Sequence, residues 1–313
     1  MEIRREQEDH DPSSPGTALT IGAYDGVHTG HRKVIAEVRR LAADRGLISA
    51  VLTFDRHPAS VVRPGSAPLL LTDTDQKLEQ LASTGVDLTM VLPFDEERAV
   101  VSAEAFITEV LVGCMGVKLV VVGEDFHFGY QRLGNVAMLR DMGSDLGFEV
   151  IGLDLVGQDG EPARDHEQVS STFIRRALAR GDLERANAML GRPYEVRGVV
   201  HTADAPDSGP DMVRVHVDAA ILLPDCGPYA CWMGDGTGRR TAVAALIGPL
   251  VGGPDPAECV ITALPVDPDQ CLPEGSVTLD FVSCLATSSA DDAAGSSNLV
   301  LRGLVVAAAD VLS

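Results

Sequence analysis

The sequence predicts an α/β protein in which a domain built on a parallel sheet precedes a small antiparallel β-barrel. The chain has 313 residues, and at about 100–200 residues per domain this length fits two domains. Between Ala18 and Val156, apolar runs typical of strands alternate with helical stretches. This alternation indicates βαβ units with helices on both faces of the sheet. After Pro193 the sequence changes to short strands separated by Gly, Pro and Asp, as in small barrels.

The first domain is predicted over residues 17–192, after a flexible polar tail at residues 1–16. Its strands and helices are expected in alternation, with strands at 19–24, 47–54, 86–94, 117–123 and 148–156, and helices at 29–46, 73–85, 102–116 and 133–147. Two of the helices end at Gly46 and Gly85, where a left-handed C-cap costs least. A further helical stretch at 170–193 closes the domain.

The barrel is predicted over residues 193–287, with strands at 194–202, 211–223, 227–234, 239–248, 258–266 and 276–285. Residues 288–313 are expected to form a flexible linker and a C-terminal helix. This helix is too short to span a bilayer, so it docks either on the barrel or on another subunit of a homo-oligomer.

Composition restricts the partners of the chain. The net charge is −21, from 25 Lys+Arg and 46 Asp+Glu, and a nucleic-acid partner is not expected because such affinity depends on neutralising phosphates. No apolar run approaches the roughly 18–20 residues of a membrane span and no signal peptide opens the sequence, so we expect no membrane partner and a cytoplasmic location. Only three residues are lysines, which we attribute to GC-rich codon usage.

The six cysteines contain no C-x-x-C pair, so a structural zinc site is not expected. Five of them follow residue 225, and a disulfide there is one alternative. We expect buried thiols instead, because the cytoplasm is reducing.

Chemistry is expected at the loop after the first strand, since ligands bind beyond the carboxyl ends of parallel strands. The segment reads Gly22-Ala23-Tyr24-Asp25-Gly26-Val27-His28-Thr29-Gly30-His31. Its glycines allow a tight turn and close approach to a ligand, and Thr29 can cap the helix that follows. The helix start favours an anion, and His28 and His31 can both reach one phosphate chain. The alternative is a glycine-rich turn with two surface histidines.

This H-x-G-H spacing resembles the signature of the nucleotidyltransferase superfamily. The whole segment resembles the opening of bacterial FAD synthetases, which are bifunctional riboflavin kinase/FMN adenylyltransferases. More blocks are similar and in register over roughly residues 18–200, namely Leu52–Pro58, Leu71–Leu78, Gly85–Asp87, Leu92–Asp95, Val122–Gly129, Ser170–Arg175 and Leu190–Tyr194. The resemblance implies a Rossmann-like nucleotidyltransferase domain followed by a riboflavin kinase-like barrel.

The resemblance also implies which residues bind the substrates ATP and FMN. The glycine loop is assigned to ATP, through Gly22, Ala23, Tyr24, Asp25, Gly26, Gly30, Gly123 and Thr172. The flavin ring is assigned to the vicinity of Phe54, His57, Pro58, Asp125, Phe126 and Phe128. Loop packing is the alternative for the aromatic residues, and a turn or cap carboxylate is the alternative for Asp125.

Four residues are assigned to catalysis. His28 and His31 are placed on the α- and β-phosphates of ATP, and Ser171 and Arg175 on the β- and γ-phosphates. Ser171 can cap a helix and donate to phosphate, and the guanidinium of Arg175, one turn on, can bind two oxygens at once. Plain capping and a solvated helix face are the alternatives. Mg²⁺ is expected on the triphosphate, held by substrate oxygens and water.

Several positions depart from the family pattern. Ala23 stands where the family usually has Asn, Tyr24 where it has Phe, and Arg56 where it has Pro. In the barrel, the kinase signature G-F-P-T-A-N falls on Val215–Ala220, so its Thr and Asn are absent. The preceding glycine-rich segment is replaced by 205–210, Glu258 aligns only weakly with the kinase base, and the helical kinase C-terminus is missing.

We therefore expect FMN adenylyltransferase activity without riboflavin kinase activity. The FMN phosphate would attack the α-phosphorus of ATP in line, while the protein aligns two anions and neutralises charge on the leaving pyrophosphate. One alternative is a nucleotidyltransferase of the same mechanism with another nucleotide, such as CTP, or an FMN-like acceptor. A third is an inactive flavin- or nucleotide-binding regulator, which the retention of all four catalytic residues disfavours.

Overall fold

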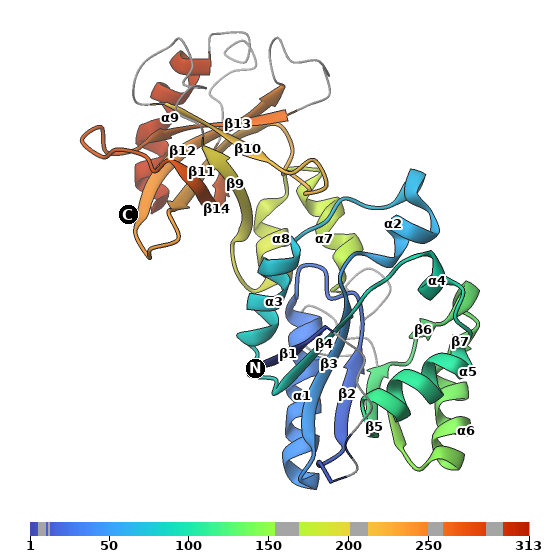
Figure 1. The fold of residues 1–313 in the computed structure, drawn as a ribbon. Coiled ribbons are helices and arrows are strands. Elements are labelled where there is room, and N and C mark those ends of the chain that lie inside the picture. The colour runs from blue at the N-terminus through green and yellow to red at the C-terminus, as the bar shows by residue number, and fades with distance from the viewer. Residues whose placement is uncertain are drawn as a thin grey trace. The chain divides into compact units, whose positions relative to one another are not determined.

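A computed structural model describes residues 1–5, 11, 13–153, 169–200, 212–249, 259–285 and 297–312. The chain divides into two compact units, Met1–Ser171 and Thr172–Ser313. The first is an α/β domain and the second carries an antiparallel barrel (Figure 1).

The first unit contains the predicted parallel sheet, in the order β1-β4-β3-β2-β5-β8. Its strands are β1 (Glu2–Arg4), β2 (Thr17–Ile21), β3 (Ile48–Phe54), β4 (Leu88–Leu92), β5 (Val117–Gly123) and β8 (Glu149–Leu153). Chain order reverses at β2, which has β3 on one side and β5 on the other. Such a switch point opens a crevice at the carboxyl ends of the strands.

The helices between these strands include α1 (Thr29–Arg45), α3 (Thr74–Ala82), a π-helix (Phe106–Cys114) and α6 (Val136–Leu146). Shorter elements are α2 (Pro58–Val62), α4 (Glu96–Ala99), α5 (Ala103–Ala105), β6 (His127–Phe128) and β7 (Gly134–Asn135). The sheet is buried on both faces. Leu19 of β2 packs with Ile107 of the π-helix, while its neighbour Ala18 packs with Val38 of α1 on the opposite face. Because successive side chains of a strand point to opposite faces of the sheet, β2 is apolar on both faces.

The N-terminal segment corrects the expectation of a flexible tail. Residues Glu2–Arg4 form β1 and pair in parallel with β4, with Ile3 opposite Thr89. Residues 6–10 and 12 lie outside the described residues, as do 154–168, which include the end of the predicted fifth strand.

The second unit contains the predicted barrel, closed in the order β10-β13-β12-β11-β14-β9 with antiparallel neighbours. The strands are β9 (Tyr194–Val200), β10 (Val213–Val217), β11 (Gly227–Gly234), β12 (Arg240–Pro249), β13 (Cys259–Pro265) and β14 (Gly275–Cys284). Tyr194, Tyr229 and Phe281 are fully buried inside this unit.

Two helices precede the barrel, α7 (Ser171–Leu178) and α8 (Leu183–Leu190). In α8, the Asn187 side chain donates to the carbonyl of Phe281 and accepts from the Tyr194 N–H group. These bonds tie α8 to β14 and β9. The compact units accordingly divide after Ser171, whereas the sequence analysis drew the domain boundary after residue 192.

The C-terminal helix α9 (Ser297–Leu312) docks on the barrel of its own chain. Leu304 and Ala308 pack into one apolar cluster with Met212, Ala230, Ala244, Leu264 and Leu285. The predicted linker, 288–297, lies outside the described residues except for its last position. None of the described helices has the length and apolar content needed to cross a membrane.

The expectation of buried thiols is wrong for most cysteines. Cys231 is buried and Cys114 is partly buried, but Cys226, Cys259, Cys271 and Cys284 are exposed. These four cysteines lie at strand ends or in loops, where their side chains do not reach the barrel interior.

Candidate functional site

The glycine loop leaves β2 at the switch point in a constrained conformation. Tyr24, Gly26 and Val27 all have positive φ angles, of 53°, 82° and 36°. Such angles cost energy in residues other than glycine and occur most often at functional sites. The Tyr24 hydroxyl donates to Thr20 Oγ1 over 2.9 Å, and a Cβ at Gly22 would lie 3.1 Å from the Tyr24 ring. Glycine at position 22 therefore gives the folded-back tyrosine its room.

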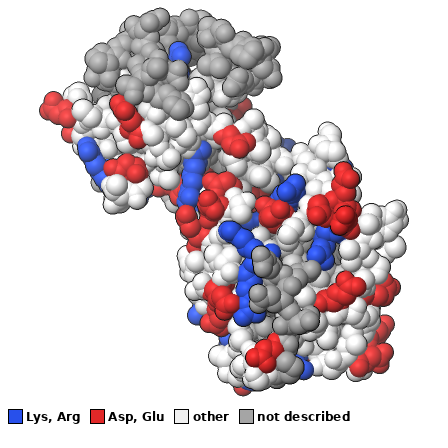
Figure 2. Space-filling view, viewed as in Figure 1, with Lys and Arg blue, Asp and Glu red and all other residues white. Residues whose placement is uncertain are grey.

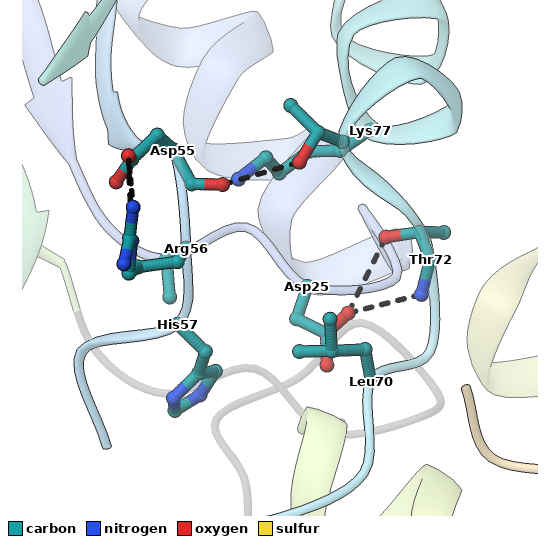
Figure 3. A pocket seen from close by; sticks show the side chains of 9 residues that line it. Asp25, Asp55, Arg56, His57, Leu70, Thr72 and Lys77 are labelled. Atoms are coloured by element: carbon teal, nitrogen blue, oxygen red, sulfur yellow. Dashed lines mark hydrogen bonds and ion pairs between the residues drawn. The ribbon is translucent and has the colours of Figure 1, made fainter. Parts of the chain in front are cut away.

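Asp25 fastens this loop to the segment before α3. Its buried carboxylate accepts from the N–H groups of Leu71 (2.9 Å) and Thr72 (3.1 Å), and from Thr72 Oγ1 (3.3 Å). Thr72 Oγ1 in turn accepts from the Gly26 N–H group at 3.2 Å. Asp25 and Thr72 face each other across the two segments in Figure 3. The carboxylate predicted to bind nucleotide is thus engaged with the protein's own donors.

The start of α1 is capped by His28 and not by Thr29, which corrects the sequence prediction. His28 is the last extended residue, and its Nδ1 accepts from the His31 N–H group at 3.3 Å. Thr29 is already the first helical residue. The rings of His28 and His31 stack with their centroids 3.6 Å apart. The centroid of the Tyr24 ring lies 4.8 Å from that of His31.

These contacts set the protonation of both imidazoles. A neutral imidazole carries one proton, and because His28 Nδ1 accepts a hydrogen bond, its proton sits on Nε2. His31 Nδ1 is enclosed and has no hydrogen-bond partner among the described residues, so a proton there would be a buried, unmet donor. Burial, together with the neighbouring His28, holds the pKa of His31 well below its usual value of 6.5. His31 is therefore a neutral Nε2–H donor at pH 7.

The beginning of the Ser-Ser-Thr block lies against the same loop. Ser171 Oγ donates to the carbonyl oxygen of Asp25 at 2.8 Å. A Cβ at Gly30 would approach the His28 ring to 3.2 Å and the Val169 carbonyl to 3.6 Å. The structure therefore brings together the glycine loop, the two histidines and Ser171.

The remaining residues of that block belong to the second unit. Thr172 is exposed and Arg175 is partly buried, and both lie on α7. Arg175 follows Ser171 by four residues, so the two share one face of the helix.

A small pocket, partly open to solvent, lies beside the glycine loop (Figure 3). Three segments meet there: the loop itself, the residues that follow β3, and the stretch that leads into α3. The lining residues are Ala23, Asp25, Asp55, Arg56, His57, Leu70, Thr72, Thr74 and Lys77.

Lys77 is a pocket residue that the sequence analysis did not select. It is buried, and its ammonium group donates to the Phe54 carbonyl at 2.6 Å. Burial lowers the pKa of Lys77, and the carboxylates of Asp25 and Asp55 oppose that shift. Asp55 also accepts from the Phe94 N–H group at 2.8 Å and pairs with Arg56 at 3.3 Å. Thr72 and Asp55 were likewise not selected.

The residues predicted to hold a flavin divide into two groups. His57 lines the pocket and caps α2, where its Nδ1 accepts from the Ala59 N–H group at 3.1 Å and Pro58 is the first helical residue. Phe126 and Phe128 stack at 5.5 Å, but Phe128 is buried in the core.

The other predicted residues at these strand ends are more exposed. Phe54 is partly buried and meets Phe94 edge to face. Asp125 is exposed, and a Cβ at Gly123 would come within 2.8 Å of its carboxylate. Gly123 therefore gives Asp125 the space to fold over the end of β5.

The fold is an α/β domain with a parallel sheet, followed in the chain by an antiparallel barrel. The sequence model of the FAD synthetase family matches residues 10–173, just over half of the chain. The chain belongs to the FAD synthetase family.

Known proteins resemble the chain over part of its length. It is 38% identical over 187 residues to a bifunctional riboflavin kinase/FMN adenylyltransferase of Haemophilus influenzae, with 59% of each chain covered. It is 35% identical over 215 residues to the protein of the same name in Listeria monocytogenes, with 68% of this chain and 66% of that protein covered. The chain spans about three fifths of the length of the first curated relatives it matches.

One solved structure shares the fold of the whole chain. The crystal structure of a macrolide-efflux protein from Streptococcus pneumoniae superposes with a TM-score of 0.77. It covers 100% of this chain and 98% of its own, at 21% identity. The likeness concerns the fold alone.

Proposed function

We propose that the protein is an FMN adenylyltransferase that transfers AMP from ATP to FMN and releases pyrophosphate. The observation that carries the proposal is the pair of stacked imidazoles at the start of α1, at the switch point of the sheet. Two Nε2–H donors and the positive end of a helix suit a polyphosphate. Family membership supports the same reaction class.

The chemistry needs positioning more than it needs a protein nucleophile. The FMN phosphate oxygen forms a bond to the α-phosphorus of ATP as the bond to pyrophosphate breaks. His28 and His31 would donate to phosphate oxygens as charge shifts to the leaving group. Ser171 and Arg175 would bind the β- and γ-phosphates, with Arg175 contributing a permanent charge.

Magnesium would enter with the nucleotide. No group of three acidic, histidine or cysteine side chains suited to a metal gathers within the described residues. The carboxylates of Asp25 and Asp55 already accept hydrogen bonds from backbone N–H groups. We infer that substrate oxygens and water supply the Mg²⁺ ligands.

We propose further that the barrel has no riboflavin kinase activity. Asp218 stands where the kinase signature has Thr, and its carboxylate accepts from the Ala220 N–H group at 2.8 Å. Ala220 itself replaces the signature's Asn and has no group to hold a nucleotide or a metal. Residues 205–210 and Glu258 lie outside the described residues.

A specific observation favours the alternative of a different substrate. Two of the positions that depart from the family pattern, Ala23 and Arg56, both line the pocket. Ala23 removes a polar side chain from one wall, and Arg56 adds a cation to another. Such changes suit a different nucleotide base or an acceptor that carries an additional anionic group.

One assay separates these functions. The full chain is incubated with FMN or riboflavin, each with ATP, CTP or GTP and Mg²⁺, and the products are identified by mass. FAD from FMN and ATP supports the proposal, a different dinucleotide supports the alternative, and no product in any mixture supports the regulator. FMN from riboflavin would refute the loss of kinase activity. The His31→Ala variant is the control for catalysis at the proposed site.

A further inference from the structure

Two exposed cysteines meet at one end of the barrel. Cys226 directly precedes β11 and Cys259 begins β13, and both strands pair with β12. In this register Gly227 lies opposite Ile247 and Cys259 lies opposite Pro249. Both cysteines therefore reach the carboxyl end of β12, although 33 residues separate them in the sequence.

The two sulfur atoms are in contact. Their Sγ–Sγ distance is 3.9 Å, and a disulfide bond of about 2.05 Å requires them to approach by roughly 2 Å more. Because both side chains are exposed, rotation about their Cα–Cβ bonds meets solvent and not packed core. The same exposure leaves both sulfurs open to a small oxidant.

We propose that Cys226 and Cys259 are a redox-active dithiol that closes to an intramolecular disulfide. The oxidant is a low-molecular-weight disulfide such as glutathione disulfide. The thiolate of one cysteine attacks a glutathione sulfur, forms a mixed disulfide and releases one glutathione thiolate. The second cysteine, as its thiolate, attacks the protein sulfur of that mixed disulfide and releases the other. The protein loses two electrons and two protons, and glutathione disulfide is reduced to two thiols.

The reaction is expected to be slow at neutral pH and faster at higher pH. Partial burial, the adjacent Cys259 and the carboxylate of Asp225 raise the pKa of Cys226. Since the thiolate is the attacking species, its small population limits the rate. Such a pair would respond to a sustained rise in oxidant concentration more than to a brief one.

Closure would also strengthen the barrel. The disulfide would link the ends of β11 and β13, which do not pair with each other because β12 lies between them. A cross-link between residues this far apart in the sequence lowers the conformational entropy of the unfolded chain and so stabilises the folded one. We expect the melting temperature of the barrel to rise by several degrees on oxidation.

The test uses the full chain, reduced and then equilibrated with mixtures of glutathione and its disulfide. Intact mass and peptide mapping without reduction follow the bond, with cleavage at both Arg and Asp so that Cys259 is separated from Cys271. The variants Cys226→Ser and Cys259→Ser each remove one partner, and Cys271→Ser is the matched exposed control.

The wild-type chain and Cys271→Ser are expected to lose two hydrogen atoms and give one cross-linked peptide pair, in which fragmentation places the bond between Cys259 and Cys226 and not Cys231 of the same peptide. The two partner variants are expected to stop at a glutathione adduct. Pairing of Cys226 or Cys259 with another cysteine, or only glutathione adducts in the wild-type chain, would overturn the proposal.

Discussion

Protonation of His31 should make the first unit less stable in acid, and replacing that histidine should remove the effect. In the unfolded chain its pKa is about 6.5, whereas burial and His28 hold its pKa well below that value in the folded chain. Below about pH 6.5 the unfolded state therefore binds a proton that the folded state does not. Above this pH the free energy of unfolding does not depend on His31. It decreases as the pH drops below about 6.5 toward the pKa of His31 in the folded chain.

The magnitude follows from the linkage relation. One group that titrates only in the unfolded state changes the free energy of unfolding by up to about 1.4 kcal/mol per pH unit. The variant His31→Gln has no titratable group but keeps an N–H donor near the place of Nε2. Its free energy of unfolding should therefore lack this slope, while its catalytic donor is retained in part.

Urea unfolding at pH values of about 7.5, 6.5 and 5.5 measures this difference. Far-ultraviolet circular dichroism follows both units, and the fluorescence of Trp232, the single tryptophan and a residue of β11, follows the second unit separately. Exposed His127→Gln is the control and should behave as the wild type. An equal loss of stability between pH 6.5 and 5.5 in His31→Gln and wild type would refute the assignment of His31 as a neutral imidazole in the folded chain.

Three further outcomes are expected. Arg175→Ala should lower the rate of FAD formation by about 10²–10³-fold, because a donor to the developing charge is lost. The control is Arg180→Ala, at an exposed residue just beyond α7. This variant should form FAD at a near-normal rate in the same assay. Asp25→Ala should lower the free energy of unfolding of the first unit by about 2–4 kcal/mol, because two buried backbone N–H groups lose their acceptor, as measured by urea denaturation. Leu304→Ala should cost roughly 2–4 kcal/mol in the second unit, because α9 loses an apolar contact with the barrel, as measured by Trp232 fluorescence.

The strand and helix pattern could be predicted because each element of the α/β unit carries its own signal. The apolar run that became β3, for example, follows α1, whose C-cap is the left-handed Gly46, so local sequence and tertiary burial agree. β1 carries no such signal. It has three residues, two of them charged, and it exists only because β4 offers a free edge for pairing. Edge strands of this kind depend on a distant partner that local sequence does not reveal.

The site was predictable in part for the same reason. The glycine loop and its histidines are contiguous, so their spacing alone indicates an anion site. Thr72 and Lys77 come from another segment and meet Asp25 only in the folded unit. A signal was nevertheless present, because Lys77 is one of three lysines and lies on the apolar face of α3, beside Leu78 and Leu81. A buried lysine requires nearby acceptors. The small number of lysines was attributed to codon usage, so no role was assigned to Lys77.

The proposed alternative of a different substrate depends on whether the departures at Ala23 and Arg56 act on one ligand. They are 33 positions apart in the sequence, and the sequence could not place them in one pocket. In the structure both line it, and Arg56 pairs at 3.3 Å with Asp55, whose carboxylate also accepts from the Phe94 N–H group. The pocket therefore combines a small residue on one wall with a cation on another, which supports the proposed alternative of a different nucleotide base or an acceptor with an additional anionic group.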